Sequence, residues 1–321
     1  MNSFQDISER FKEKFKERHF PLEPQGLYEP ANYFLQLGGK HIRPVVCLMG
    51  NELFDEIHPD SWDVAMALEI FHNFTLVHDD IMDEASLRRG KETVHKRFGL
   101  NKALLSGDMM MIVAYQYLNK ISPEILPSIL SLFCKTAIEV CEGQQLDMDF
   151  EEKEKVSLAE YIRMIELKTS VLLAASLQMG AMLGGATPHN YHKLYAFGKN
   201  LGIAFQIQDD YLDAFGDSNK FGKETGGDIK RNKKTFLLLH ALEEAKGKDK
   251  ETLEKLLKSN DEDKVERVIA IFKNCGVDTW ANNLKEKYFS TAMRLLEEVV
   301  VISSRKKPLK DFANYLMQRE S

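Results

Sequence analysis

Apolar residues recur at intervals of three and four residues along most of this chain of 321 residues. That spacing places them on one face of an α-helix. Alternating runs of β-branched residues, the pattern of a half-buried strand, are almost absent. The clearest helical periodicity lies in residues Ser61–His78, Lys102–Asn119, Ile125–Phe150, Leu158–Leu183, Tyr191–Phe215 and Lys234–Ala245. We therefore expect an all-α protein.

The connections between these segments predict how many domains the chain forms. Most of the nine prolines fall between the periodic segments, and no linker is long enough to divide the chain. Hydrophobic residues make up 44% of the sequence, enough to bury a large core. No internal repeat has the period of a solenoid. The sequence predicts a single all-α domain spanning residues 1–321.

Composition excludes several classes of function. The net charge of −6 and the pI of about 5.9 argue against a nucleic-acid-binding protein, which needs a basic face. The charged stretch Met1–His19 lacks the apolar region of a signal peptide. The most apolar stretch, Val171–Ala186, is too short to span a bilayer. The four cysteines form no CxxC pair, so we expect neither disulfides nor a thiolate metal site. A cytoplasmic location is therefore expected.

An acidic cluster, Asp79-Asp80-Ile81-Met82-Asp83, ends one of the periodic segments. In a helix, Asp79 and Asp83 lie on one face about one turn apart. Their charges repel, and a divalent cation that bridges the two carboxylates removes the conflict. Oxygen-only ligands favour Mg²⁺, which also binds substrate phosphates. By itself, such a cluster is more often a solvated helix end than a metal site.

A second cluster, Asp209-Asp210-Tyr211-Leu212-Asp213, repeats the pattern 130 residues later. Basic residues follow each cluster, Arg88 and Arg89 after the first and Lys223 and Lys233 after the second. Arginine suits bidentate phosphate binding. The C-terminal end of a helix repels anions, so metal ions are needed to reverse the local sign. Two such clusters could hold several metal ions around a diphosphate.

Three further groups of residues fit an anionic substrate, although each also has an ordinary structural interpretation. Gly38-Gly39-Lys40-His41-Ile42-Arg43 combines a flexible backbone with cations, but it is not a P-loop and could be a simple turn. His72 precedes Asp79 by seven residues and could be a core histidine. Lys168-Thr169 lies in an apolar helical pattern, where a lysine can also extend to the surface.

Six blocks in this order resemble the trans-isoprenyl diphosphate synthases (polyprenyl synthetases) over nearly the whole chain. The blocks are Gly38–Arg43, His78–Asp83 with Arg88–Gly90, Gly143–Gln144, Lys168–Thr169, Phe205–Asp213 and Lys223–Lys233. The resemblance implies a helical bundle around a central active-site cavity, a homodimer and three Mg²⁺ ions per site. It implies a head-to-tail prenyltransferase that condenses isopentenyl diphosphate with an allylic diphosphate.

The resemblance also assigns roles to residues. Asp79, Asp83 and Asp209 match metal ligands, and Asp80 matches a residue that supports them. The allylic diphosphate site matches Arg88, Lys168, Thr169, Gln206, Lys223 and Lys233. The isopentenyl diphosphate site matches Gly39, Lys40, Arg43, His72 and Arg89. The acidic residues, with Arg88, Lys168 and Lys223, are expected to carry the catalysis.

Product length depends, in the resembling family, on residues just before the first acidic motif. Phe74 and Thr75 stand five and four positions before Asp79, and Phe71 lies about one turn further back. This pattern favours a C20 product, geranylgeranyl diphosphate, with C15 farnesyl diphosphate next. The alternatives are a non-catalytic partner subunit of a prenyl synthase and a class I terpene cyclase, although a cyclase normally carries a different second motif.

Overall fold

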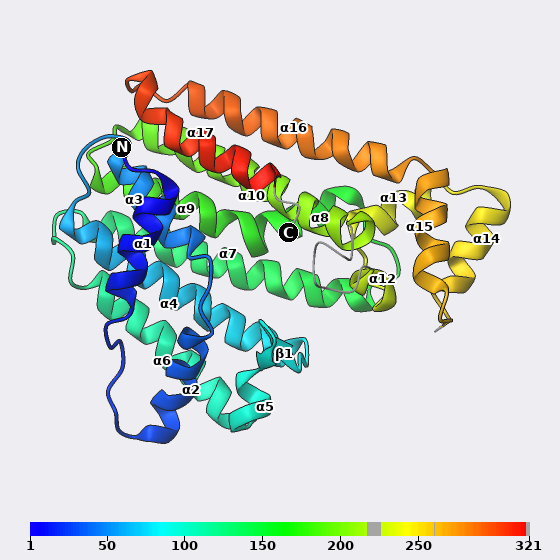
Figure 1. Ribbon diagram of the computed structural model, residues 1–321, viewed down its shortest axis with the longest axis horizontal. Coiled ribbons are helices and arrows are strands. Elements are labelled where there is room, and N and C mark those ends of the chain that lie inside the picture. Colours follow the sequence, from blue (N-terminus) through cyan, green and yellow to red (C-terminus); the bar gives the residue numbers. More distant parts are fainter. Residues whose placement is uncertain (217–225, 260, 319–321) are drawn as a thin grey trace. The chain divides into compact units, whose positions relative to one another are not determined.

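The computed structural model describes residues 1–216, 226–259 and 261–318, and these residues are largely helical (Figure 1). The prediction of an all-α protein is confirmed. Five predicted segments correspond to single helices, whereas Leu158–Leu183 comprises two α-helices joined by a π-helix. The helices are α1 Phe4–Phe15, α2 Gln25–Gln36, α3 Ile42–Glu52, α4 Pro59–Met82, α5 Val94–Phe98, α6 Leu100–Leu118, α7 Leu126–Glu152, α8 Leu158–Ile165, η1 Glu166–Ser170, α9 Val171–Leu183, α10 Pro188–Phe215, α12 Gly227–Lys230, α13 Phe236–Glu244, α14 Gly247–Leu256, α15 Lys264–Asn274, α16 Val277–Glu297 and α17 Ser303–Gln318.

The chain forms two compact units. The first comprises Met1–Lys135, Ala175–Tyr195 and Val299–Leu309, and the second comprises the described residues of Thr136–Ala174, Ala196–Glu298 and Lys310–Ser321. The expectation of a single domain over residues 1–321 stays a prediction.

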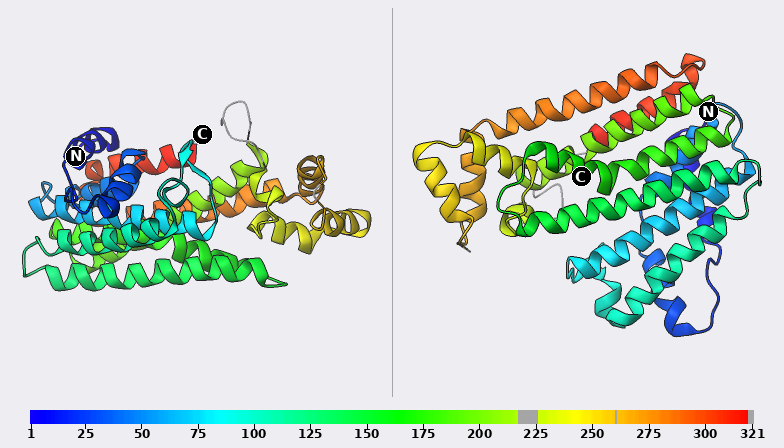
Figure 2. Two further views of the ribbon diagram at one scale, coloured as in Figure 1. Left: turned by 90° about the horizontal axis from the view of Figure 1, so that it is seen from below. Right: turned by 180° about the vertical axis from the view of Figure 1, so that it is seen from behind.

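In the first unit, α4 packs against α3 and α6, and Figure 2 shows α4 and α6 running side by side. Pro59 occupies the first turn of α4, where its missing N–H costs nothing. The side chain of His58 accepts a hydrogen bond from the Asp60 N–H and caps the helix. The helix then buries Leu68, Phe71 and neighbouring residues. It ends at Met82, within the first acidic motif.

Glycines let α9 approach α3 very closely within the first unit. A Cβ atom at Gly180 would lie 1.8 Å from the Cys47 carbonyl oxygen, and one at Gly50 would lie 2.6 Å from the Leu177 carbonyl oxygen. Real Cβ atoms do not come this near to backbone oxygens, so larger residues at these positions would force the helices apart. The crossing of α3 and α9 therefore depends on glycine.

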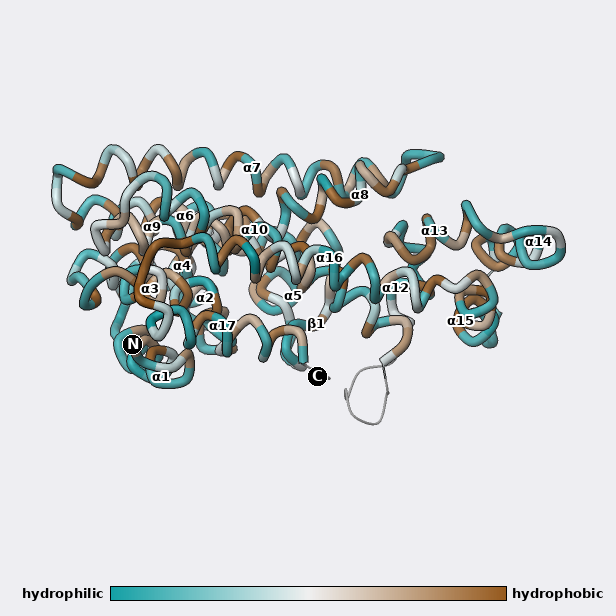
Figure 3. The backbone as a smooth tube through the Cα atoms, turned by 90° about the horizontal axis from the view of Figure 1, so that it is seen from above, coloured by the Kyte–Doolittle hydropathy of each residue, from teal (hydrophilic) through white to brown (hydrophobic). Residues whose placement is uncertain are grey.

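In the second unit, a core of aromatic and aliphatic residues that includes Phe150, Tyr161 and Phe236 connects α7, α8, α10 and α13. The tube of α14 is mostly hydrophilic in Figure 3, and this helix buries Leu253 and Leu256. Among the described residues, no helix is both long and apolar enough to cross a bilayer.

Candidate active site

The first acidic motif is organised by Arg88. The Arg88 Nε–H donates to both carboxylate oxygens of Asp80, at 2.8 and 2.9 Å, and Nη2 lies 3.4 Å from an oxygen of Asp79. Asp80 is 1% exposed. Burial raises the pKa of the Asp80 carboxyl group, and the charge of Arg88 opposes that shift. Asp80 therefore turns inward to Arg88, whereas Asp83 at the helix end is exposed.

A short hairpin, which the sequence did not predict, brings Arg88 to Asp80. Strands β1 (Leu87–Arg88) and β2 (Lys91–Glu92) pair antiparallel around the two-residue turn Arg89-Gly90. Both turn residues have positive φ, 53° at Arg89 and 73° at Gly90, as a type I′ turn requires. The turn therefore places Arg88 and Arg89 beside the end of α4.

Arg43, His72 and Arg89 form the second group of predicted residues that the first unit brings together. The Arg43 Nη1–H donates to His72 Nε2 at 2.9 Å. Burial, followed by the charge of Arg43, lowers the pKa of His72 well below its usual range, so the imidazole is neutral. A Cβ atom at Gly39 would lie 3.1 Å from Arg89 Nη2, so glycine there makes room for the guanidinium. Lys40 is exposed.

Two residues behind this group, His41 and Glu69, were not predicted as site residues. His41 adopts a left-handed conformation with φ of 48°, and its Nδ1 lies 2.8 Å from Glu69 Oε1. Asn73 also donates to Glu69 Oε1, at 3.1 Å. Buried Arg43 Nε has no hydrogen-bond partner among the described residues. An unsatisfied buried guanidinium N–H favours an anionic ligand.

In the second unit, Lys168 and Thr169 lie in the π-helix η1, a structure often found at functional sites. Glycines on two helices make room for it. A Cβ at Gly143 of α7 would lie 2.2 Å from the Lys168 N, and a Cβ at Gly202 of α10 would lie 2.8 Å from the Ser170 Cα. This close packing explains why Gly143 belongs to the matched blocks.

Asp147, one turn after Gly143 on α7, joins two of the predicted lysines. Its Oδ2 lies 2.6 Å from Lys168 Nζ and 3.8 Å from Lys233 Nζ. Burial by itself raises the pKa of Asp147, but Lys233 and Lys168 together hold it below its usual value. One carboxylate thus orients two cations. The matched block ends at Gln144, so the motifs did not identify Asp147 as a site residue.

In the second acidic motif, Asp210 is buried and the other aspartates lie near the end of α10. The Tyr161 hydroxyl donates to buried Asp210, and Gln206 Nε2 donates to the same carboxylate at 2.9 Å. The Gln206 amide oxygen in turn accepts from Thr169 at 3.3 Å. Burial raises the pKa of Asp210 to about 7, against the opposing hydrogen bond from Tyr161. Asp210 is therefore a supporting residue, while Asp209 is exposed.

Asp213, the last acidic residue of this motif, bonds to the main chain of α12. Its Oδ2 accepts a hydrogen bond from the Asp228 N–H at 3.0 Å. The predicted substrate residue Lys223 lies outside the described residues.

The described residues contain no group of three or more His, Cys, Asp or Glu side chains gathered as a metal site. The donors of the two motifs are nevertheless carboxylate oxygens, which suit Mg²⁺. This ion is usually bound through one or two carboxylates, with water and substrate phosphates completing the octahedron. Asp79 and Asp83, one turn apart, fit that pattern.

The predicted product-length residues lie on α4. Phe74 is buried, and its ring centroid lies 5.5 Å from that of Phe71 and 4.9 Å from that of His78. The Thr75 hydroxyl donates to the His72 carbonyl at 2.8 Å. The Phe74 ring thus makes a tilted contact with Phe71 and an edge contact with His78, which directly precedes the acidic motif.

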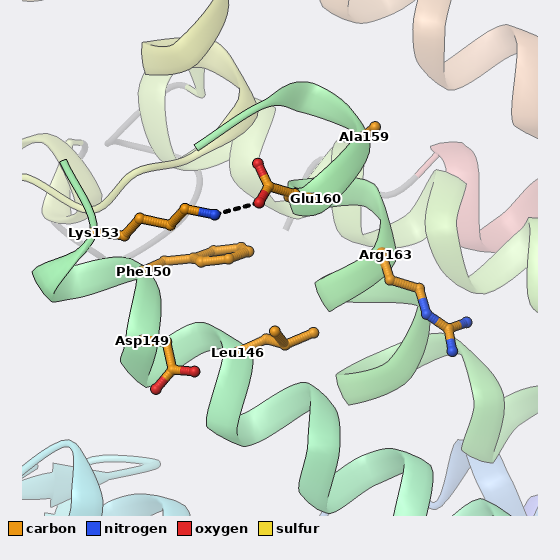
Figure 4. Close-up of a pocket in the computed structure, with 7 residues that line it drawn as sticks. All are labelled: Leu146, Asp149, Phe150, Lys153, Ala159, Glu160 and Arg163. Atoms are coloured by element: carbon orange, nitrogen blue, oxygen red, sulfur yellow. Dashed lines mark hydrogen bonds and ion pairs between the residues drawn. The ribbon is translucent and has the colours of Figure 1, made fainter. Parts of the chain in front are cut away.

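A surface cavity of about 380 Å³ in the second unit contains none of the predicted site residues. It is lined by Leu146, Asp149, Phe150, Lys153, Ala159, Glu160 and Arg163. Lys153 pairs with Glu160 across it (Figure 4), and Arg163 pairs with Glu166 at 2.7 Å. Both cations are thus neutralised within the protein, and we assign the cavity no ligand.

Comparisons with known proteins find relatives over almost the whole chain. The family described as Polyprenyl synthetase matches residues 24–275. The chain is 39% identical over 316 residues to the geranylgeranyl pyrophosphate synthase of Geoglobus acetivorans, covering 98% of this chain and 96% of that protein. It is 36% identical over 321 residues to the short chain isoprenyl diphosphate synthase of Methanothermobacter thermautotrophicus, covering 100% and 98%. A crystal structure of a geranylgeranyl pyrophosphate synthase matches all of both chains with a TM-score of 0.95 and 43% identity.

Proposed function

Because this chain belongs to the polyprenyl synthetase family and is a prenyltransferase, we propose that it condenses isopentenyl diphosphate with an allylic diphosphate to make geranylgeranyl diphosphate. Relatives that bear the name geranylgeranyl synthase support this product. The observation that carries the proposal is that both acidic motifs and the cations of the isopentenyl diphosphate site are present together. A non-catalytic partner subunit usually lacks one of these sets.

The group around Arg43 binds the diphosphate of isopentenyl diphosphate. Arg43 offers its Nε–H, which has no partner among the described residues, and Arg89 and exposed Lys40 add positive charge. Neutral His72 accepts a hydrogen bond from Arg43 without neutralising it, so it fixes the guanidinium while leaving the charge for the substrate. Gly39 keeps space beside Arg89.

The allylic diphosphate is bound by Arg88 together with Lys168, Thr169, Gln206, Lys223 and Lys233. Asp79, Asp83 and Asp209 would hold three Mg²⁺ ions, with Asp80 kept behind the first motif by Arg88. Mg²⁺ held by these residues would stabilise the negative charge on the leaving diphosphate. Lys168 and Lys233, oriented by Asp147, contribute to the same stabilisation from preorganised positions.

The reaction needs no covalent enzyme intermediate. The allylic C–O bond breaks, and its electron pair leaves with the diphosphate. The double bond of isopentenyl diphosphate then attacks the allylic cation, and a proton passes to the released diphosphate. The residues of the chain bind both diphosphates, hold the reacting carbons together and exclude water from the cation.

Phe74 limits the growth of the product. We place its ring, supported by Phe71, at the floor of the space that receives the growing chain, with Thr75 beside it. This position accounts for a C20 product; C15 farnesyl diphosphate would require a higher floor.

The protein acts as a homodimer in a reducing cytoplasm. An apolar row on α6 supports dimerisation, because Leu105 is 59% exposed and Ile112, two turns later, is 55% exposed. A second copy of the chain would cover this row. Sedimentation of the wild-type protein and of Ile112→Asp tests it, since the charged variant should be monomeric.

The proposed function is tested by incubating purified protein with Mg²⁺, labelled isopentenyl diphosphate and each allylic primer in turn. Label should appear in a C20 diphosphate. A partner subunit or a terpene cyclase would leave isopentenyl diphosphate unconsumed, and a cyclase would release a hydrocarbon or alcohol from the allylic primer alone.

A further inference from the structure

Lys234 caps the end of α7. Its ammonium group donates to three main-chain carbonyl oxygens there, those of Phe150 at 2.7 Å, Glu151 at 3.2 Å and Lys153. A lysine ammonium has three N–H donors, so these bonds satisfy all of them. The last carbonyls of a helix lack partners within the helix and carry partial negative charge, which a cation stabilises.

Lys264, at the start of α15, holds the other side of the same segment. It is 3% exposed, and its Nζ donates to Asn232 Oδ1 at 2.7 Å and to the Ser259 carbonyl at 3.0 Å. Asn232 adopts the left-handed conformation with φ of 55°. A buried lysine needs such partners because an unpaired charge in the interior is very costly. Lys264 thus fixes the turn that precedes Lys233.

Lys233 lies between Asn232, which Lys264 holds, and Lys234. Its own side chain reaches Asp147 at 3.8 Å, and Asp147 stands three residues before Phe150 on α7. Because Lys234 bonds to the end of α7, it ties the main chain of Lys233 to the helix that carries Asp147. The geometry of the Lys233–Asp147 pair therefore depends on Lys234 and on Lys264.

We propose that Lys234 and Lys264 are positioning residues for Lys233, which act by holding its ammonium group where it binds the allylic diphosphate. This inference rests on the proposed function. Neither lysine contacts the substrate in the proposed arrangement, and both act through the main chain on either side of Lys233. Their removal should therefore weaken binding of the allylic diphosphate and leave isopentenyl diphosphate binding unchanged.

The experiment compares Lys234→Met and Lys264→Met with matched lysine controls on exposed positions, Lys248→Met and Lys273→Met. We expect KM for farnesyl diphosphate to rise about tenfold in the first pair, because loss of a supporting residue commonly weakens binding by about this factor. KM for isopentenyl diphosphate should stay within about twofold, because a change confined to one substrate marks a lost binding contact. The controls should match wild type.

A double-mutant cycle separates positioning from a general structural role. In a Lys233→Met background, Lys234→Met should raise KM for farnesyl diphosphate no further, because the residue through which it acts is gone. Additive effects, or equal changes in both KM values, would overturn the proposal. Should Lys234→Met fold poorly, Lys234→Gln keeps two donors, and the same cycle applies to it. If the wild type is active and these variants leave KM for farnesyl diphosphate unchanged, the positioning role is refuted and the proposed function stands. If the wild type is inactive, the proposed function itself is refuted.

Discussion

Several acidic residues of the motifs act as supports inside the protein, and hydrogen bonds hold them there. Asp80 receives two hydrogen bonds from Arg88, and Asp210 receives one each from Tyr161 and Gln206. A buried carboxylate is tolerated only with such partners. The sequence identified the aspartates by their spacing. It could not show which member of each motif points inward, because that depends on partners distant in sequence.

The first prediction concerns Arg88. Replacing Arg88 with Met leaves the Asp80 carboxylate buried and unpaired, so the free energy of unfolding should fall by roughly 3 kcal/mol. Activity should fall as well. Lys91→Met, an exposed lysine of the same hairpin, is the control. Urea denaturation measures the free energy of unfolding of both variants. An equal stability for the two variants would show that the Arg88–Asp80 pair contributes nothing.

The second prediction concerns the neutral state of His72, whose pKa burial lowers, followed by the charges of Arg43, Arg89, Arg88 and His41. Between the folded value and the unfolded value of about 6.5, the unfolded chain binds a proton that the folded protein does not. Stability should therefore fall as pH drops through this range, by up to about 1.4 kcal/mol per unit.

His72→Gln removes that proton uptake while keeping an acceptor for Arg43. Denaturation of wild type and variant at pH 7 and pH 5 measures the difference. The wild type should lose more stability than His72→Gln on acidification, whereas exposed His192→Gln should behave as wild type. Parallel losses in wild type and His72→Gln would mean that His72 is protonated in the folded protein.

At the scale of elements, helix boundaries could largely be predicted, and local departures from the helix could not. The periodicity of Leu158–Leu183 predicted one helix, but η1 interrupts it where Gly143 and Gly202 allow close packing. The hairpin around Arg89-Gly90 has only two residues in each strand, too few for an alternating pattern. Lys264 is buried, although a lysine is rarely buried unless its charge has partners. These features arise from tertiary contacts.

The third prediction concerns the crossing of α3 and α9. Gly180→Ala would place a methyl group against the Cys47 carbonyl, so it should destabilise the protein by about 3 kcal/mol. Gly26→Ala in α2 meets only the flexible Lys102 side chain, with its Cε at 3.8 Å, and should be neutral or stabilising by up to about 1 kcal/mol. Urea midpoints compare the two. Equal midpoints would contradict the close packing.

The fourth prediction concerns the length of the product. Phe74→Ala removes the proposed floor, so products longer than C20 should form, up to the limit set by Phe71 below it. The cavity should also cost roughly 3 kcal/mol of stability. Phe20→Ala, a buried aromatic that stacks on Tyr28, should cost similar stability without lengthening the product. Mass analysis of products decides, and an unchanged C20 product from Phe74→Ala would place the floor elsewhere.

At the scale of the whole molecule, the family followed from six blocks of residues in order, and the comparisons confirm it. A single block is also compatible with an ordinary structural role. Six blocks in the same order are not, and together they indicated the family. Residues such as Asp147 and Tyr161 lie outside what the motifs specified, although the fold places them against motif residues. The supporting residues of a site are selected by packing, which a motif does not record.

Elongation of prenyl chains by this protein should require both acidic motifs. The most direct test is product analysis of purified protein with Mg²⁺, isopentenyl diphosphate and farnesyl diphosphate, alongside Asp79→Asn and Asp209→Asn variants. We predict a C20 diphosphate from wild type and little product from either variant. Isopentenyl diphosphate left unconsumed by the wild-type protein would contradict it.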